Sequence, residues 1–378
     1  MDYKTPLSWD NDELIYQISL TQIPGVGEYL AKLLVSYCGS AKGVFTEKKS
    51  FLLKIPEIGD FTAHSISKFK HFDFAVQEIE LLKANQITPI FYLDEKFPAK
   101  LKVYDDSPIL MYYKGNANLN HQRIISIVGT RKSTAYGKQF TDDLISELAK
   151  YDVIVISGLA FGTDTNAHKA CVKNNVTTVG VLGHGFHTLF PSSNKKLSEE
   201  MILNGGLLTE FNFSMPGNKE NFPKRNRIVA GMSDAIIVVE SAIKGGSLIT
   251  ADIANSYDKD IYALPGRIND PYSLGCNKLL YDHKASIIDS IPGLIFSLGY
   301  QKNKPNKQSQ QMQMDLHLSA DEKLVYNELS KGEQTIDDLF FYTKISVSKL
   351  ALVLLDLEFK NLVKSLPGKK YALAYSMG

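Results

Sequence analysis

Two hydrophobic periodicities divide most of this chain into a helical part and an alternating part. Between residues 11 and 83 apolar residues recur at helical spacing, as in Leu14, Ile15 and Ile18, and this pattern predicts helices. Between residues 124 and 266 short apolar runs alternate with longer amphipathic stretches. That alternation predicts a parallel sheet covered by helices on both faces. We expect an α/β protein with an extended Rossmann-like, doubly wound, mostly parallel sheet behind a small helical domain.

The predicted strands are short apolar runs bounded by turn residues. They cover Ile87–Leu93, Ile109–Gly115, Ile124–Val128, Val153–Ile156, Thr178–Leu182, Leu207–Glu210, Ala235–Glu240 and Asp260–Ala263. Helix patterns lie between the last six of them, near 136–150, 163–174, 194–204, 223–233 and 247–258. Ligands of such sheets bind at the carboxyl ends of the strands, so the loops that follow these strands are the first place to look for a site.

Three further helix patterns and a short hairpin end the chain, at 320–330, 335–343, 346–360 and 362–373. This succession predicts a winged-helix-like domain at 318–378, and the polar stretch 301–317 has the composition of a linker. The remaining domains are predicted at 1–83 (helix-hairpin-helix or SAM-like) and 84–300 (Rossmann-like).

The helix in the recognition position of the last domain has an unusual composition for a DNA reader. Val347–Asn361 is mostly Leu, Val and Ala, with Lys349 and Lys360 balanced by Asp356 and Glu358. A helix that reads the major groove presents Arg, Asn or Gln at exposed positions. We therefore favour a packing or protein-interaction role for it.

Composition and charge narrow the classes of function. Hydrophobic residues make up 44% of the chain and charged residues 22%, as in soluble globular proteins, and the net charge is only +1. Nucleic-acid binding would therefore need a local basic patch. The N-terminus has no signal pattern and no apolar run could span a bilayer. Cys38, Cys171 and Cys276 are few and widely spaced. We expect a cytoplasmic protein without a membrane partner, a disulfide scaffold or a Cys-based zinc site.

Arginine is scarce, and its placement predicts an anion site. The chain has five arginines, and Arg131, Arg225 and Arg227 lie with Lys224 in or near loops of the predicted sheet. A guanidinium can hold a phosphate through two parallel hydrogen bonds. Glycines at strand ends let backbone N–H groups approach the same anion; those of interest here are Gly129, Gly158, Gly162, Gly183, Gly185, Gly245 and Gly246.

Known nucleotide fingerprints are missing from these loops. The first loop, Gly129–Gly137, lacks the Gly-x-Gly-x-x-Gly pattern, and no P-loop occurs in the chain. NAD binding and ATP hydrolysis are both disfavoured, so no cofactor is predicted. Acidic and histidine side chains also gather near strand ends, but without metal-ligand spacing or a nucleophile–base pair: Asp164, His168, His184, His187 and Glu240. Structural roles are favoured for them, with no catalytic or metal-binding residue.

Two smaller patterns bear on DNA binding. Ile23-Pro-Gly-Val-Gly27 matches a helix-hairpin-helix turn, whereas Ile55-Pro-Glu-Ile-Gly59 carries an acid that faces phosphate badly. We favour a packing role for both turns. Aromatic residues beside basic loops can stack on unpaired bases, and Phe222 is the strongest candidate because Pro223-Lys-Arg follows it; the others are Phe161, Phe186 and Phe190.

Several long motifs, in order, resemble the DNA-processing protein A (DprA/Smf) family over roughly residues 87–298. They are Val128-Gly-Thr-Arg131, Ser157–His168, Phe222–Ser233, Gly246–Ala251, Leu264-Pro-Gly266 and Gly275-Cys-Asn277. Two positions depart from the family pattern: Gly-Ser-Arg is Gly-Thr-Arg here, and Tyr-Pro is Phe190-Pro191. The terminal domains also look like accessory domains of that family.

The resemblance implies a non-enzymatic protein that binds single-stranded DNA. Such a protein would load the RecA recombinase onto incoming strands in natural transformation and would form a homodimer through its Rossmann-like domain. By motif match, the DNA-binding residues would be Gly129, Arg131, Ser157, Gly158, Phe222, Lys224, Arg225, Arg227 and Gly246.

Two other functions remain open on the sequence. One is a nucleotide-processing enzyme of the lysine-decarboxylase-like phosphoribohydrolase type. Such enzymes carry Pro-Gly-Gly-x-Gly-Thr with a catalytic glutamate nearby; Lys244-Gly-Gly-Ser247 matches that motif only in part, and Glu240 would be the glutamate. The other is a sequence-specific regulator that binds DNA through residues 318–378.

Overall fold

The computed structural model describes residues 12–300, 319–330, 332–360, 362–366 and 370–373. Two compact units divide the chain, at residues 1–304 and 305–378. Within the described ranges, no helix is long and apolar enough to cross a membrane.

A nine-stranded sheet in the order β1-β2-β6-β5-β4-β3-β7-β8-β9 organises the first unit. Every pair from β6 through to β9 is parallel, while β1 and β2 join antiparallel at one edge. The strands are β1 Thr88–Phe91, β2 Leu110–Gly115, β3 Ile124–Val128, β4 Ile154–Ser157, β5 Thr177–Val181, β6 Gly205–Thr209, β7 Ala235–Val238, β8 Asp260–Ala263 and β9 Ser286–Ile287. The strand order reverses between β3 and β7, which is where open α/β sheets bind their ligands.

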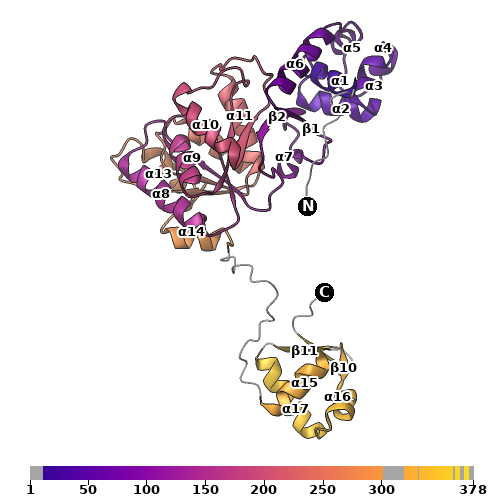
Figure 1. Cartoon of the computed structure of the whole chain (residues 1–378), viewed down its shortest axis with the longest axis vertical. Coiled ribbons are helices and arrows are strands. Elements are labelled where there is room, and N and C mark those ends of the chain that lie inside the picture. Colours follow the sequence, from indigo (N-terminus) through magenta and orange to yellow (C-terminus); the bar gives the residue numbers. More distant parts are fainter. Residues whose placement is uncertain (1–11, 301–318, 331, 361, 367–369, 374–378) are drawn as a thin grey trace. The chain divides into compact units, whose positions relative to one another are not determined.

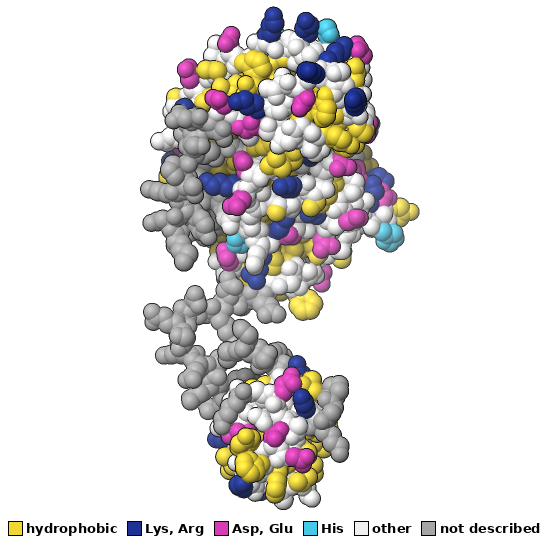
Figure 2. All heavy atoms as spheres, turned by 90° about the vertical axis from the view of Figure 1, so that its right-hand side faces the viewer, with side chains coloured by type: hydrophobic (Ala, Val, Ile, Leu, Met, Phe, Trp, Pro, Cys, Tyr) yellow, Lys and Arg dark blue, Asp and Glu magenta, His cyan; other side chains and the backbone are white. Residues whose placement is uncertain are grey.

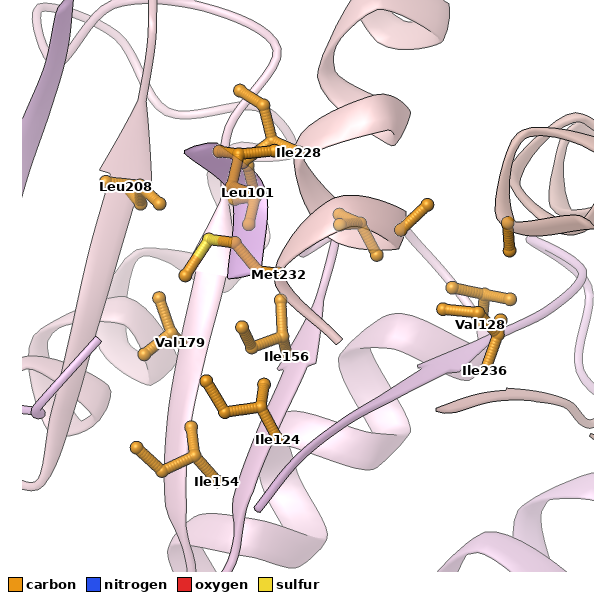
Figure 3. Packing of buried hydrophobic residues seen from close by; sticks show 14 of the residues in the cluster. Leu101, Ile124, Val128, Ile154, Ile156, Val179, Leu208, Ile228, Met232 and Ile236 are labelled. Atoms are coloured by element: carbon orange, nitrogen blue, oxygen red, sulfur yellow. The ribbon is translucent and has the colours of Figure 1, made fainter. Parts of the chain in front are cut away.

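Helices cover both faces of the sheet, because alternate strand residues point to opposite sides. Ile124 and Val128 face a core that includes Ile228 and Met232 of α11 (Figure 3). Ile125 and Ile127 face the other core, with residues of α8 and α9. The helices of this part are α7 Ala99–Lys102, α8 Ala135–Leu148, α9 Thr163–Lys173, α10 Lys195–Leu203, α11 Asn221–Met232, α12 Gly246–Ser256, α13 Leu274–Tyr281 and α14 Ile291–Ser297, with the 3-10 turn Ser192–Asn194. The predicted doubly wound, mostly parallel fold is confirmed.

From residue 12 on, the helices that precede the sheet lie together beside β1 and β2 (Figure 1). They are α1 Asp12–Leu20, α2 Glu28–Cys38, α3 Ala41–Thr46, α4 Lys49–Leu52, α5 Asp60–Ser67 and α6 Phe72–Ala84. Their apolar core includes Leu110 and Tyr112 of β2. The two hairpin-like turns contact each other: Phe61 occupies the space that a Cβ on Gly25 would need, and the Tyr29 hydroxyl donates to Glu57 at 3.0 Å.

The second unit has its own apolar core. Its elements are α15 Ala320–Leu329, β10 Gln334–Thr335, α16 Ile336–Thr343, α17 Val347–Phe359, β11 Val363–Leu366 and β12 Lys370–Leu373, with the strands in the order β10-β12-β11. Both α15 and α16 begin with reciprocal capping boxes, at Ser319 and Thr335, which fix the helix starts. Three helices and a small sheet form the predicted winged-helix arrangement.

Candidate nucleic-acid interface

A cleft of about 530 Å³ opens at the carboxyl ends of β3 and β4, beside the point where the strand order reverses. The first residues of α12 and of α11 complete its walls. A helix N-terminus directs free N–H groups and a partial positive charge towards an anion. The cleft brings together six residues predicted from the sequence: Gly129, Arg131, Gly158, Phe222, Arg225 and Gly246.

Arg131 is the exposed arginine of the cleft. It follows β3, and its guanidinium carbon lies 5.6 Å from the centre of the Phe222 ring. This distance allows a cation–π interaction, which holds the side chain over the ring. Because the side chain of Arg131 is already exposed, it can bind a phosphate in the cleft without first breaking contacts with buried groups.

Arg225 lines the same cleft but is only 5% exposed. Its Nη1 group donates to the carbonyl oxygens of Gly158 and Val181, and its Nε group donates to Asn226 at 3.0 Å. Burial lowers the pKa of Arg225, and the nearby Asp164 carboxylate opposes that effect. Burial in turn raises the pKa of Asp164, which the charge of Arg225 lowers. Arg225 thus lies buried at the inner wall of the cleft, to which it contributes positive charge.

The position of the Arg225 side chain leaves no room for any residue larger than glycine at position 158. A Cβ at Gly158 would overlap the guanidinium group of that side chain. We expect Gly158→Ala to displace Arg225, to destabilise the protein by about 1–3 kcal/mol as overpacking does, and to weaken ligand binding. Urea denaturation and oligonucleotide titration would measure both effects. Gly59→Ala is the matched control, because a Cβ there meets nothing within 4 Å and the residue lies outside the cleft; equal stabilities for the two variants would contradict the prediction.

The structure separates the other predicted residues from this cleft. Arg227 pairs with Glu28 of α2 at 2.9 Å and with Glu210 after β6. Lys224 is exposed and lines a second cleft of about 290 Å³, which also contains Glu28 and Glu210. The side chain of Ser157 is buried and donates to Ile127 O at 2.5 Å. The inference that these three residues share one pocket with Arg131 is therefore corrected.

The separation has a simple cause. The basic cluster lies within α11, where the sequence predicts a helix, and successive residues of a helix point about 100° apart. Phe222 and Arg225 are three residues apart and share the cleft face, as neighbours at that spacing do. Lys224 and Arg227 are also three apart, and they face α2 and the end of β6.

Two aromatic residues extend the site beyond Phe222. The ring centres of Phe222 and Phe190 lie 6.1 Å apart, and those of Phe190 and Phe161 lie 6.2 Å apart. Phe161 and Phe190 are about half exposed, whereas Phe186 packs against core residues. Phe161 follows β4, and Phe190 belongs to the loop after β5, so their positions at strand ends were the available signal. The cleft also contains Lys219, Asn226, Ser247 and Thr250, which the sequence did not single out.

The titratable residues near the sheet edge have structural partners. Glu240 accepts hydrogen bonds from Thr134 N at 2.9 Å and Thr134 Oγ1 at 2.5 Å, at the start of α8. His168 is buried with Nδ1 2.7 Å from Thr178 Oγ1, and burial, assisted by Arg225, lowers its pKa to about 3. His184 Nε2 accepts from Phe190 N at 3.1 Å. No group of three potential metal ligands occurs in the described part of the chain.

The fold and cleft define a Rossmann-like protein with a strand-end cleft that contains Arg131 and Arg225, without a nucleotide fingerprint, and with a winged helix. The family model for the DNA recombination-mediator protein A matches residues 88–298, and the model for the DprA winged helix domain matches residues 310–369. The chain belongs to the DNA recombination-mediator protein A family.

Relatives by sequence support this assignment. Protein Smf of Synechocystis is 31% identical over 299 residues, which are 76% of this chain and 73% of that protein. The DNA processing protein DprA of Bacillus subtilis is 39% identical over 187 residues, or 49% of this chain and 63% of that protein.

Two solved structures are similar as well. The structure of DNA processing protein A from Streptococcus pneumoniae gives a TM-score of 0.65 at 26% identity, covering 76% of this chain and 99% of that chain. A structure of the Helicobacter pylori protein, described as giving insights into a single-stranded DNA binding mode, gives a TM-score of 0.53 at 30% identity, covering 57% of this chain and 98% of that chain.

Proposed function

We propose that the cleft binds single-stranded DNA, with phosphates at Arg131 and unpaired bases on the row Phe161–Phe190–Phe222. The observation that carries this proposal is the contact between an exposed arginine and one end of an aromatic row. Phosphate and base faces alternate along a single strand, and stacking on aromatic rings does not depend on base identity. The single-stranded DNA named for the Helicobacter pylori structure supports the same ligand.

Gly129 and Gly246 of the cleft differ in the space around them. Gly129 directly follows β3, and a Cβ there would meet Thr163 at the start of α9. Gly246 opens α12 with free space around it, so a phosphate can approach its N–H group. Lys224 takes a different role from Arg131: it lies outside the first cleft and would meet a strand that continues towards α2.

Oligonucleotide titration across a range of salt concentrations tests the proposal. We expect binding that favours single strands and weakens steeply with salt, because phosphate contacts release counterions. Phe161→Ala and Phe190→Ala should each weaken binding about tenfold, within the range that stacking on one base contributes. Tyr37→Ala removes an exposed aromatic residue of α2 as a control. Equal affinity for single and double strands would contradict the proposal.

We propose further that the protein acts as a recombination mediator without catalysis. A recombination-mediator role accords with the description of its family. In this proposal the protein would load RecA onto incoming single strands in natural transformation. The enzymatic alternative loses support because both oxygens of Glu240 accept hydrogen bonds at the start of α8. Adding the protein should shorten the lag before RecA assembles on an oligonucleotide; an unchanged lag would refute this role.

A homodimer of the Rossmann-like unit belongs to the same proposal. Around the edge strand β9, Tyr281, Ile287 and Phe296 expose 60–85% of their surface. Large exposed apolar side chains on β9 and on the helices before and after it, α13 and α14, favour a contact surface there. Sedimentation should give twice the chain mass of 42.1 kDa, and a monomer at micromolar concentration would contradict this part.

A further inference from the structure

Helix α17 presents apolar residues on two opposite faces. Leu350, Val353, Leu354 and Leu357 are buried in the core of the second unit. Leu352, Leu355 and Phe359 lie on the other side of the helix and are 64%, 47% and 78% exposed. With Ser348 they form a stripe at spacings of four, three and four residues, which is the a/d pattern of helices that pack against one another. We call these four residues the outer seam.

The outer seam is unsuited to reading DNA. Its flanking lysines already have acidic partners: Lys349 pairs with Asp321, and Lys360 pairs with Glu322 at 2.6 Å. The exposed residues of the helix include no arginine, asparagine or glutamine, the side chains that read base edges. Figure 2 shows hydrophobic side chains gathered on the surface of this unit. Exposed leucines and a phenylalanine at this spacing favour a partner that is itself an apolar helix.

We propose that the outer seam pairs antiparallel with the outer seam of a second copy of this chain. In antiparallel pairs, a positions pack against d positions of the partner. Leu352 then packs against the partner's Leu355, and Leu355 packs against the partner's Leu352. Phe359 packs against the partner's Ser348, so that the largest side chain of the seam meets the smallest.

The charged residues beside the outer seam favour pairing with a second copy, and favour the antiparallel direction over the parallel one. The same alignment places Lys349 beside the partner's Asp356, twice because of the two-fold symmetry. The Lys349 ammonium has three donors, so it can hold this carboxylate while it keeps Asp321 of its own copy. In a parallel pair the position that flanks Asp356 is the partner's Ala351, and the match is lost. A second copy therefore complements both the apolar stripe and the charges beside it.

Charge reversal in residues 305–378, a compact unit with its own apolar core, gives a specific test that a dimer of the Rossmann-like unit cannot mask. Lys349→Glu alone brings a glutamate against the partner's Asp356, and Asp356→Lys alone brings Lys349 against a lysine. Each variant should self-associate about tenfold more weakly, because two attractive pairs become repulsive. An equimolar mixture of the two variants restores both opposite-charge pairs, and should recover the association of the wild type in sedimentation velocity.

An apolar variant provides an independent measurement. Leu352→Asp should weaken self-association about a hundredfold, because it places a carboxylate in an apolar contact. Leu324→Asp is its control, since Leu324 is a half-exposed leucine of α15 outside the seam. Circular dichroism would establish that each variant stays folded. Association of Leu352→Asp equal to that of the control, or failure of the mixture to recover, would overturn the proposal and leave a different protein as the partner.

Discussion

Arg131→Ala is expected to weaken binding of a single-stranded oligonucleotide about thirtyfold, as loss of about 2 kcal/mol of charge-assisted hydrogen bonding would do. The side chain is exposed at the cleft and lies over Phe222, so its removal costs little folding stability. Arg131→Lys should recover only part of the affinity, because an ammonium cannot form the paired hydrogen bonds of a guanidinium. Fluorescence anisotropy at two salt concentrations would measure both variants, and the salt dependence should become shallower.

Arg123→Ala is the matched control for this prediction. Arg123 precedes β3 at the opposite edge of the sheet, where it lies against Tyr300. Its loss should leave the affinity and the salt dependence unchanged. If Arg131→Ala bound the oligonucleotide as tightly as Arg123→Ala, the cleft would not be the DNA site.

Arg225→Ala should act chiefly on stability, lowering the free energy of unfolding by about 3–5 kcal/mol, because two buried hydrogen bonds from a charged group are lost. The substitution leaves the carbonyls of Gly158 and Val181 without their donor and the buried Asp164 without its compensating charge. Chemical denaturation would measure the loss. A weakened DNA affinity of this variant, taken alone, would therefore not identify Arg225 as a phosphate ligand.

A double variant separates the two contributions. Arg225→Ala combined with Asp164→Asn removes both buried charges, and we expect it to recover part of the lost stability. If the double variant were less stable than Arg225→Ala by the whole loss that Asp164→Asn causes alone, the two side chains would not be coupled.

The sequence predicts the sheet well because strand and helix periods leave a clear alternation in residues 124–266. It also predicts the carboxyl edge of the sheet as the site, since glycines and Arg131 directly follow apolar strands. It does not predict how α11 is turned about its axis, which depends on what packs around the helix. For that reason Lys224, Arg225 and Arg227 could be recognised as a cluster but not assigned to separate surroundings.

The aromatic row was harder to predict for a related reason. Phe161 and Phe190 come from loops after neighbouring strands, and only the parallel pairing of β4 and β5 brings those loops together.

The short edge strand β9 has two residues, too few to leave a periodic pattern in the sequence.

Helix α11 is fastened on two sides, by Arg225 to carbonyls beside β4 and in β5 and by Arg227 to α2 and Glu210. A helix held in this way cannot turn or slide without breaking buried charge-assisted bonds. The wall of the cleft is therefore preorganised, and the entropy lost on binding is mostly that of the nucleic acid. Calorimetry should accordingly show an unfavourable entropy that grows with the number of nucleotides ordered, while amide hydrogen exchange in α11 stays slow with and without the strand.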